Sequence, residues 1–179
     1  MSKFYGPYAC SIFHKSIIDF VLGCLLEEKY PKVPLSASSY PQFLRTKSGI
    51  AELFVHFSFP QSLFPEEPSL QKYIFAISDV AYCAEGINDV LSFYKESVIG
   101  TERNNYVFTY ARTHNITACA ALEHRAQTTY EHLERIGKIF AEQDIEEKDS
   151  LEVLTVPQVV KYFIQGTYAL KTLHPVTLV

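Results

Sequence analysis

The segment from Asn88 to Glu96, with the sequence NDVLSFYKE, contains polar residues whose spacing could support metal chemistry. Successive residues of an α-helix are separated by about 100°, so Asn88, Ser92 and Glu96 spread over about 80° and share one face. Lys95 lies about 20° from Asn88 on the same face. An amide, a hydroxyl and a carboxylate all supply hard oxygen donors. The pattern therefore predicts a helix face that could bind Mg²⁺, with a lysine beside it for a phosphate group.

A second interpretation of the same face is a solvated polar surface. Asn, Ser and Glu are common on the exposed sides of amphipathic helices, and the spacing alone favours this interpretation. Asp89 lies off the face and is expected to be a surface acid or a supporting acid behind the metal ligands. The metal hypothesis needs more than spacing.

The elements that must position this face are all helical. Apolar residues recur at helical spacing, whereas no strand-like alternation of useful length appears. Thr101–Asn115 is polar and is expected to be a loop or a lid. The pattern predicts an all-α helical array in one domain, with helices over 11–30, 40–49 (kinked at Ser48-Gly49), 50–57, 69–96 (stopped by Gly100), 117–142 and 156–173, and an acidic linker between the last two.

Composition excludes several classes of function. The chain has 179 residues, a net charge of −4 and no basic stripe, so no nucleic-acid partner is expected. The N-terminus lacks a signal-peptide layout. The most apolar run, from Ile17 to Leu26, contains Asp19 and is too short to span a bilayer. The four cysteines form no CxxC pair, which is typical of free thiols. We expect a cytoplasmic protein without a membrane partner.

The polar segment also carries a family resemblance. NDVLSFYKE matches every specified position of the second metal motif of class I terpene synthases, (N/D)Dxx(S/T)xxxE. Its SFYKE ending resembles the fungal trichodiene synthase-like sesquiterpene synthases most. The resemblance implies that Asn88, Ser92 and Glu96 chelate one Mg²⁺ and that Lys95 contacts the substrate diphosphate.

A second segment supports the first. YPQFLRTKSG, residues 40–49, resembles the helix with a central break in the same family. The resemblance implies that Arg45 senses the diphosphate. It also implies that the chain breaks at Gly49, where a backbone carbonyl points at the ionising substrate. Judged by residue type alone, the planar guanidinium of Arg45 suits phosphate oxygens, because it can donate two parallel hydrogen bonds to them. A lone arginine is nevertheless more often a surface residue.

The resemblance runs from about Phe4 to about Gly166 and corresponds to the C-terminal half of a terpene synthase domain. Residues 1–179 are thus expected to form one partial domain. The aspartate-rich motif, which holds two further Mg²⁺ ions in the family, is absent, and so is the late Arg-Tyr pair. The chain reads His174-Pro175 where that pair is expected. Only one Mg²⁺ site is therefore supported.

The implied reaction is the ionisation and cyclisation of a prenyl diphosphate, such as farnesyl diphosphate, with release of diphosphate. With one metal site, the chain alone is expected to be weak or inactive. The alternative is a non-catalytic helical module that binds an isoprenoid or forms dimers, and a homodimer is left open. The sequence gives neither the terpene product nor the oligomeric state.

Overall fold

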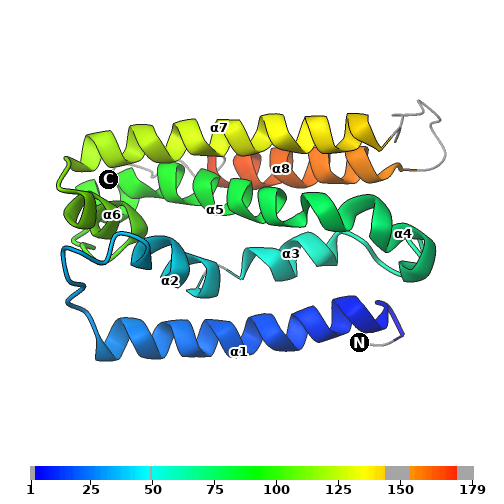
Figure 1. Cartoon of the computed structure of the whole chain (residues 1–179), viewed down its shortest axis with the longest axis horizontal. Helices are drawn as coiled ribbons and strands as arrows, with labels where there is room; N and C mark the ends of the chain where they lie inside the picture. The colour runs from blue at the N-terminus through cyan, green and yellow to red at the C-terminus, as the bar shows by residue number, and fades with distance from the viewer. Residues whose placement is uncertain (1–2, 49, 144–153, 173–179) are drawn as a thin grey trace.

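The computed structural model describes residues 3–48, 50–143 and 154–172, and the side chains as far as residue 169. These residues form an all-α array with no strand in the described ranges, as predicted (Figure 1). The helices are α1 (Pro7–Lys29), α2 (Tyr40–Ser48), α3 (Ala51–Phe57), α4 (Glu66–Tyr73), α5 (Ile77–Phe93), α6 (Tyr106–His114), α7 (Ala118–Glu142) and α8 (Val156–Thr172).

Helix α5 lies at the centre of the array. It contacts α7 and α8 on one side and α3 on the other, and α1 packs against α2 and α3 at the edge (Figure 1). The main core lies between these layers and includes Val55, Val80, Ile136 and Val160. Helices α5 and α7 approach closely at Gly86, where a Cβ atom would lie only 2.0 Å from Oγ1 of Thr129. This close contact fixes the relative position of the two helices that carry most of the polar site.

Helix α1 begins four residues earlier than predicted. Gly6 is the N-cap, and Pro7 occupies the first turn. The backbone amides of Tyr8 and Ala9 donate to the carboxylate of Glu66, each at 2.9 Å. Glu66 is almost sixty residues away in sequence, so local sequence could not reveal this cap.

The predicted long helix over 69–96 is interrupted. Helix α4 begins at Glu66, and a short 3₁₀ turn, Ile74–Ala76, separates it from α5. Helix α5 ends at Phe93, and a π-helical turn, Tyr94–Ile99, follows it. Gly100 ends the segment as predicted. The regular α-helix expected through Glu96 is therefore wrong over its last three residues.

The polar stretch expected to be a loop contains helix α6. Asn105 caps α6, because its side chain accepts a hydrogen bond from the amide of Phe108 at 3.2 Å. Asn115 ends the helix in a left-handed conformation. Both asparagines are residues that often stand at helix ends, so the sequence contained a signal for a helix here. The polarity of the segment favoured a loop instead.

The predicted break after Ser48 is confirmed, because α2 ends there and α3 starts at Ala51. Gly49 itself lies outside the described residues. Ile50 has a φ angle of 43°, so a residue with a branched side chain takes a left-handed conformation. The linker and the residues from 173 onward also lie outside the described ranges, except for Gln143 at the linker's start.

Helix α1 exposes an apolar face on the edge of the array. Ile17, Ile18, Val21, Leu22 and Leu25 are each 46–60% exposed. The segment was predicted to be too short to span a bilayer, but α1 has 23 residues. By length and composition it is long and apolar enough to cross a membrane. Core helices of soluble proteins meet the same criterion, so this finding concerns length and composition only.

The long-range cap predicts a stability effect. Replacing Glu66 by alanine removes two charge-assisted hydrogen bonds from the first turn of α1, so the free energy of unfolding should fall by about 1–2 kcal/mol. Urea denaturation followed by circular dichroism measures this change. The neighbouring exposed residue provides the control, because Glu67→Ala should change stability by less than about 0.5 kcal/mol. Equal stabilities of the two variants would contradict the capping role.

Candidate functional site

A cavity of about 290 Å³ opens where the C-terminal end of α5 meets α2 and the segments that flank it. Polar groups from several elements converge on it. Its lining comprises Glu27, Tyr30, Pro31, Val33, Pro41, Leu44, Arg45, Ser48, Asn88, Asp89, Glu96, Glu102, Asn104, Asn105, Tyr106 and Thr109. The break after α2, the end of α5 and the cap of α6 thus meet at one place.

The structure brings three of the predicted site residues to this cavity. Arg45, Asn88 and Glu96 all line it. Ser92 is buried, with 7% of its surface exposed, and its hydroxyl donates to the backbone carbonyl of Asn88 one turn earlier. Lys95 is exposed and does not line the cavity.

The π-helical turn explains part of this arrangement. Its amides reach one residue further back than in an α-helix, and the amide of Gly100 donates to the carbonyl of Lys95 at 3.0 Å. The wider turn changes the angle between successive side chains. The angular positions calculated for Lys95 and Glu96 on a regular α-helix therefore do not apply. Turns of this kind often occur at functional sites.

Asp89 lies between two arginines. Its Oδ1 atom forms an ion pair of 2.9 Å with Nε of Arg45. Its Oδ2 atom accepts from Nε of Arg125 at 3.0 Å and lies 2.8 Å from a terminal nitrogen of the same guanidinium. Only 7% of the Asp89 side chain is exposed. The expectation that Asp89 is a surface acid is thus wrong, whereas a supporting role agrees with this position.

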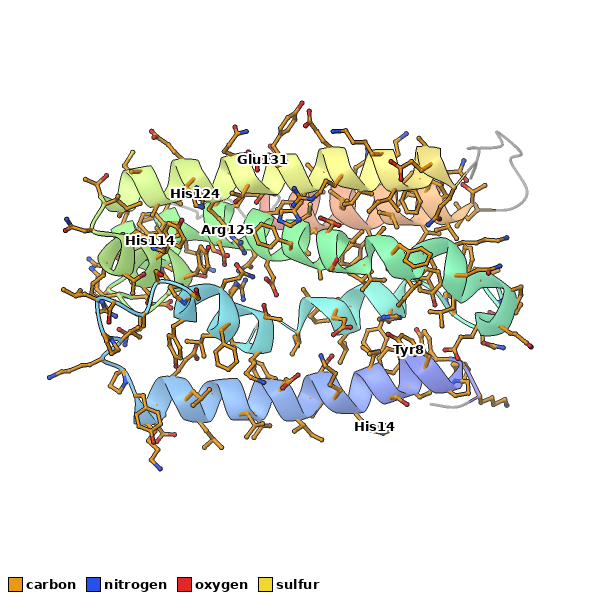
Figure 2. The ribbon with its side chains drawn as sticks, in the orientation of Figure 1. Tyr8, His14, His114, His124, Arg125 and Glu131 are labelled. Atoms are coloured by element: carbon orange, nitrogen blue, oxygen red, sulfur yellow. The ribbon has the colours of Figure 1, made fainter. Side chains whose placement is uncertain are left out.

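Arg125 is the site residue that sequence reasoning missed. It lies on α7, on the side of that helix facing α5, and it is completely buried (Figure 2). Its guanidinium carbon lies 4.2 Å from the ring centre of Tyr82 and 4.3 Å from that of Tyr106, and a terminal nitrogen donates to the amide oxygen of Gln42 at 3.2 Å. The surrounding sequence is rich in charge, so it gave no sign that this one cation is internal.

Glu85 is a buried carboxyl group beside the same cluster. Only 6% of it is exposed, and one of its oxygens lies 3.8 Å from a terminal nitrogen of Arg125. Burial raises the pKa of Glu85 to about 7, although the positive charges of Arg45 and Arg125 oppose the shift. At neutral pH this carboxyl group is therefore close to half protonated.

The cavity lining also carries three glutamates. Glu27, Glu96 and Glu102 all line it. The pKa of Glu102 is raised by burial and then by the negative charges of Glu96 and Glu27, so both carboxylates repel Glu102. A cation among them would relieve this repulsion.

The donors can be tested for metal binding. In the part of the chain that the structure describes, no group of three His, Cys, Asp or Glu side chains is arranged to hold a metal ion. A metal at this cavity would therefore use the amide oxygen of Asn88 with the carboxylate of Glu96 and would take further oxygens from water or from a ligand. That donor set fits Mg²⁺, which keeps several positions for such oxygens.

Comparisons with known proteins identify a family and several relatives of the chain. The family model described as trichodiene synthase matches residues 1–175. The chain is 40% identical over 116 residues to the (E)-beta farnesene synthase of Metarhizium brunneum (strain ARSEF 3297), covering 63% of this chain and 35% of the relative. It is 26% identical over 173 residues to the trichodiene synthases of Fusarium cortaderiae and Fusarium culmorum, covering 96% of this chain and 46% of each relative. The chain thus spans less than half the length of these relatives.

The buried carboxyl group predicts a pH dependence of stability. The pKa of Glu85 is raised from 4.5 to about 7 on folding, so the folded state binds the proton of this carboxyl group more tightly than the unfolded state does. The stability that follows from this is fully present below pH 4.5 and is lost as the pH rises through 7. The loss is on the order of 3 kcal/mol. In Glu85→Gln the free energy of unfolding should vary less between pH 5 and pH 8, as urea denaturation would measure. Exposed Glu134→Gln should keep the wild-type pH dependence, and a wild-type profile in Glu85→Gln would contradict the shift.

Proposed function

This chain belongs to the trichodiene synthase family, and from that premise we propose that its cavity binds the diphosphate group of a prenyl diphosphate together with Mg²⁺. The proposed reaction is the ionisation and cyclisation of a fifteen-carbon substrate such as farnesyl diphosphate, with release of diphosphate. One observation carries the proposal. Arg45, Asn88 and Glu96, which lie on three different elements, line a single cavity.

Two of the oxygen donors that line the cavity would hold the metal. Asn88 offers an amide oxygen from α5, and Glu96 offers a carboxylate from the π-helical turn. Ser92 lies one turn from Asn88, and its hydroxyl would contribute an oxygen on releasing the Asn88 carbonyl. Mg²⁺ bound here would supply positive charge to the diphosphate as it leaves.

Arg45 would bind the diphosphate directly. A guanidinium has five N–H donors, and the ion pair with Asp89 involves only the one on Nε. The terminal nitrogens can therefore serve phosphate oxygens at the cavity wall. When the carbon–oxygen bond breaks, its electron pair stays on the diphosphate, and positive charge beside that group lowers the barrier. The proposed role of Lys95 requires its exposed ammonium group to reach the mouth of the cavity.

The size of the cavity limits what this chain can do. Pockets that enclose organic ligands usually measure about 300–1,000 Å³, and this one has about 290 Å³ with largely polar walls. It suits a diphosphate better than a fifteen-carbon chain. We therefore propose that these residues supply the diphosphate-binding wall and that turnover by this chain alone is weak or absent.

The second candidate is a module that binds a diphosphate or an isoprenoid without turnover. The same small polar cavity favours it. The two candidates differ in product formation but share the binding site.

A cytoplasmic location, a homodimer and the absence of nucleic-acid and membrane partners stay predictions.

The proposal predicts metal-dependent binding of inorganic diphosphate. Isothermal titration calorimetry should detect binding in the presence of MgCl₂ and little binding without it. Asn88→Ala and Glu96→Gln should each weaken the affinity at least about tenfold, which corresponds to about 1.4 kcal/mol. Glu123→Gln, at an exposed position on α7, is the control and should bind as the wild type does. Binding that ignores both Mg²⁺ and the two site substitutions would refute the proposal.

Turnover separates the two candidates. Purified protein incubated with farnesyl diphosphate and MgCl₂ should give at most a small amount of hydrocarbon product by gas chromatography, because one metal site supplies less charge stabilisation than a full cluster. Product lost in Glu96→Gln would identify a weak synthase, whereas binding without any product would favour the non-catalytic module. Abundant cyclic product would contradict the expected weakness of the chain.

A further inference from the structure

We propose that Asp89, clamped by the buried Arg125, is a positioning residue that fixes the guanidinium of Arg45 at the cavity wall. The inference rests on the proposed function, in which Arg45 binds the diphosphate. Asp89 itself is assigned no contact with the substrate. It would act through Arg45, by setting where the donors of that side chain lie.

The first step of the argument concerns Arg125. A guanidinium taken out of water loses several kcal/mol of hydration, so its surroundings must compensate. Here the guanidinium carbon lies 4.2 and 4.3 Å from the centres of two tyrosine rings, and one terminal nitrogen donates to Gln42. Nε and the other terminal nitrogen lie 3.0 and 2.8 Å from Oδ2 of Asp89. No part of Arg125 is exposed. Arg125 therefore has little freedom to move, and neither has the carboxylate oxygen that it holds.

The second step concerns the other oxygen of Asp89. With Oδ2 held by Arg125, the carboxylate has little freedom to rotate, and Oδ1 lies 2.9 Å from Nε of Arg45, an ion-pair contact in which the N–H is not aligned as a hydrogen bond. Arg45 is only 16% exposed, and its Nε atom is shielded from solvent. An arginine side chain has several rotatable bonds, and fixing it in advance removes part of the entropy cost of binding.

The third step concerns the positions of Asn88 and Asp89 on α5 and of Arg125 on α7. Asp89 directly follows the proposed metal ligand Asn88 on α5, so the same helix turn presents the metal donor and the anchor of the diphosphate donor. Helix α7 supplies the clamp from the opposite layer. The distance between Asn88 and Arg45 is thereby set by buried contacts, because Arg45 pairs with the residue that directly follows Asn88 on α5.

The test uses two readouts and a matched control. In ¹⁵N-labelled protein without ligand, the Nε–H signal of Arg45, assigned through Arg45→Lys, reports positioning directly. It should exchange slowly with water in the wild type and be lost or broadened in Asp89→Asn. Asp79→Asn is the control. Asp79 lies on the same helix with 13% of its side chain exposed and is paired with Arg135 at 3.0 Å, but it does not line the cavity. Its loss should leave the Arg45 signal unchanged.

The second readout is the affinity for inorganic diphosphate with MgCl₂. Asp89→Asn should weaken it about tenfold, because Arg45 loses the ion pair that holds its guanidinium in place. In the Arg45→Ala background the same change should have less than about a twofold effect, because Asp89 acts through Arg45. A loss of affinity that is additive in the double variant would overturn the inference, and so would an unchanged Arg45 signal in Asp89→Asn.

Asp89→Glu covers the case in which Asp89→Asn fails to fold. It keeps the charge that Arg125 requires but moves the carboxylate by one methylene group, so circular dichroism should show a folded protein whose diphosphate affinity is reduced. Wild-type affinity in a folded Asp89→Glu would overturn the positioning role. If the wild type itself binds no diphosphate, the proposed function fails and the inference fails with it, whereas failure of the inference alone leaves Mg²⁺-dependent binding intact.

Discussion

The buried ion pair between Arg125 and Asp89 is the interaction on which the cavity depends. An internal guanidinium is tolerated only where several partners replace water. The partners of Arg125, which lies on α7, come from three other helices: Gln42 from α2, Tyr82 and Asp89 from α5, and Tyr106 from α6. Any relative shift of these helices would leave a buried charge without compensation. The pair therefore ties the position of α2, which carries Arg45, to that of α5, which carries Asn88.

Local sequence patterns predicted most of the helices, because each one has its own apolar stripe and its own end signals. They predicted the break after Ser48 and the oxygen donors of α5 for the same reason. They missed what depends on distant residues. The start of α1 is set by Glu66, and the internal position of Arg125 is set by rings on two other helices. Spacing within one helix carries no information on either.

The π-helical turn shows a different limit. A face calculated from 100° steps assumes that the α-helix continues, but the hydrogen bonding changes after Phe93. Glu96 still lines the cavity with Asn88, whereas Ser92 is buried and Lys95 is exposed. The metal motif names residue types, but the backbone geometry decides which of them reach the cavity.

In the proposed function, the charges around the cavity would favour a metal together with a diphosphate over either alone. The cavity lining carries the cation Arg45 as well as the carboxyl groups of Glu27, Glu96 and Glu102. A free anion would be attracted to Arg45 and repelled by the carboxylates, whereas a free cation would be attracted to the carboxylates and repelled by Arg45. A divalent cation bound to a diphosphate offers charges of both signs to a lining that carries both. The same mixture makes the position of Arg45 matter, since a guanidinium displaced toward the carboxylates would pair with them instead of with the ligand.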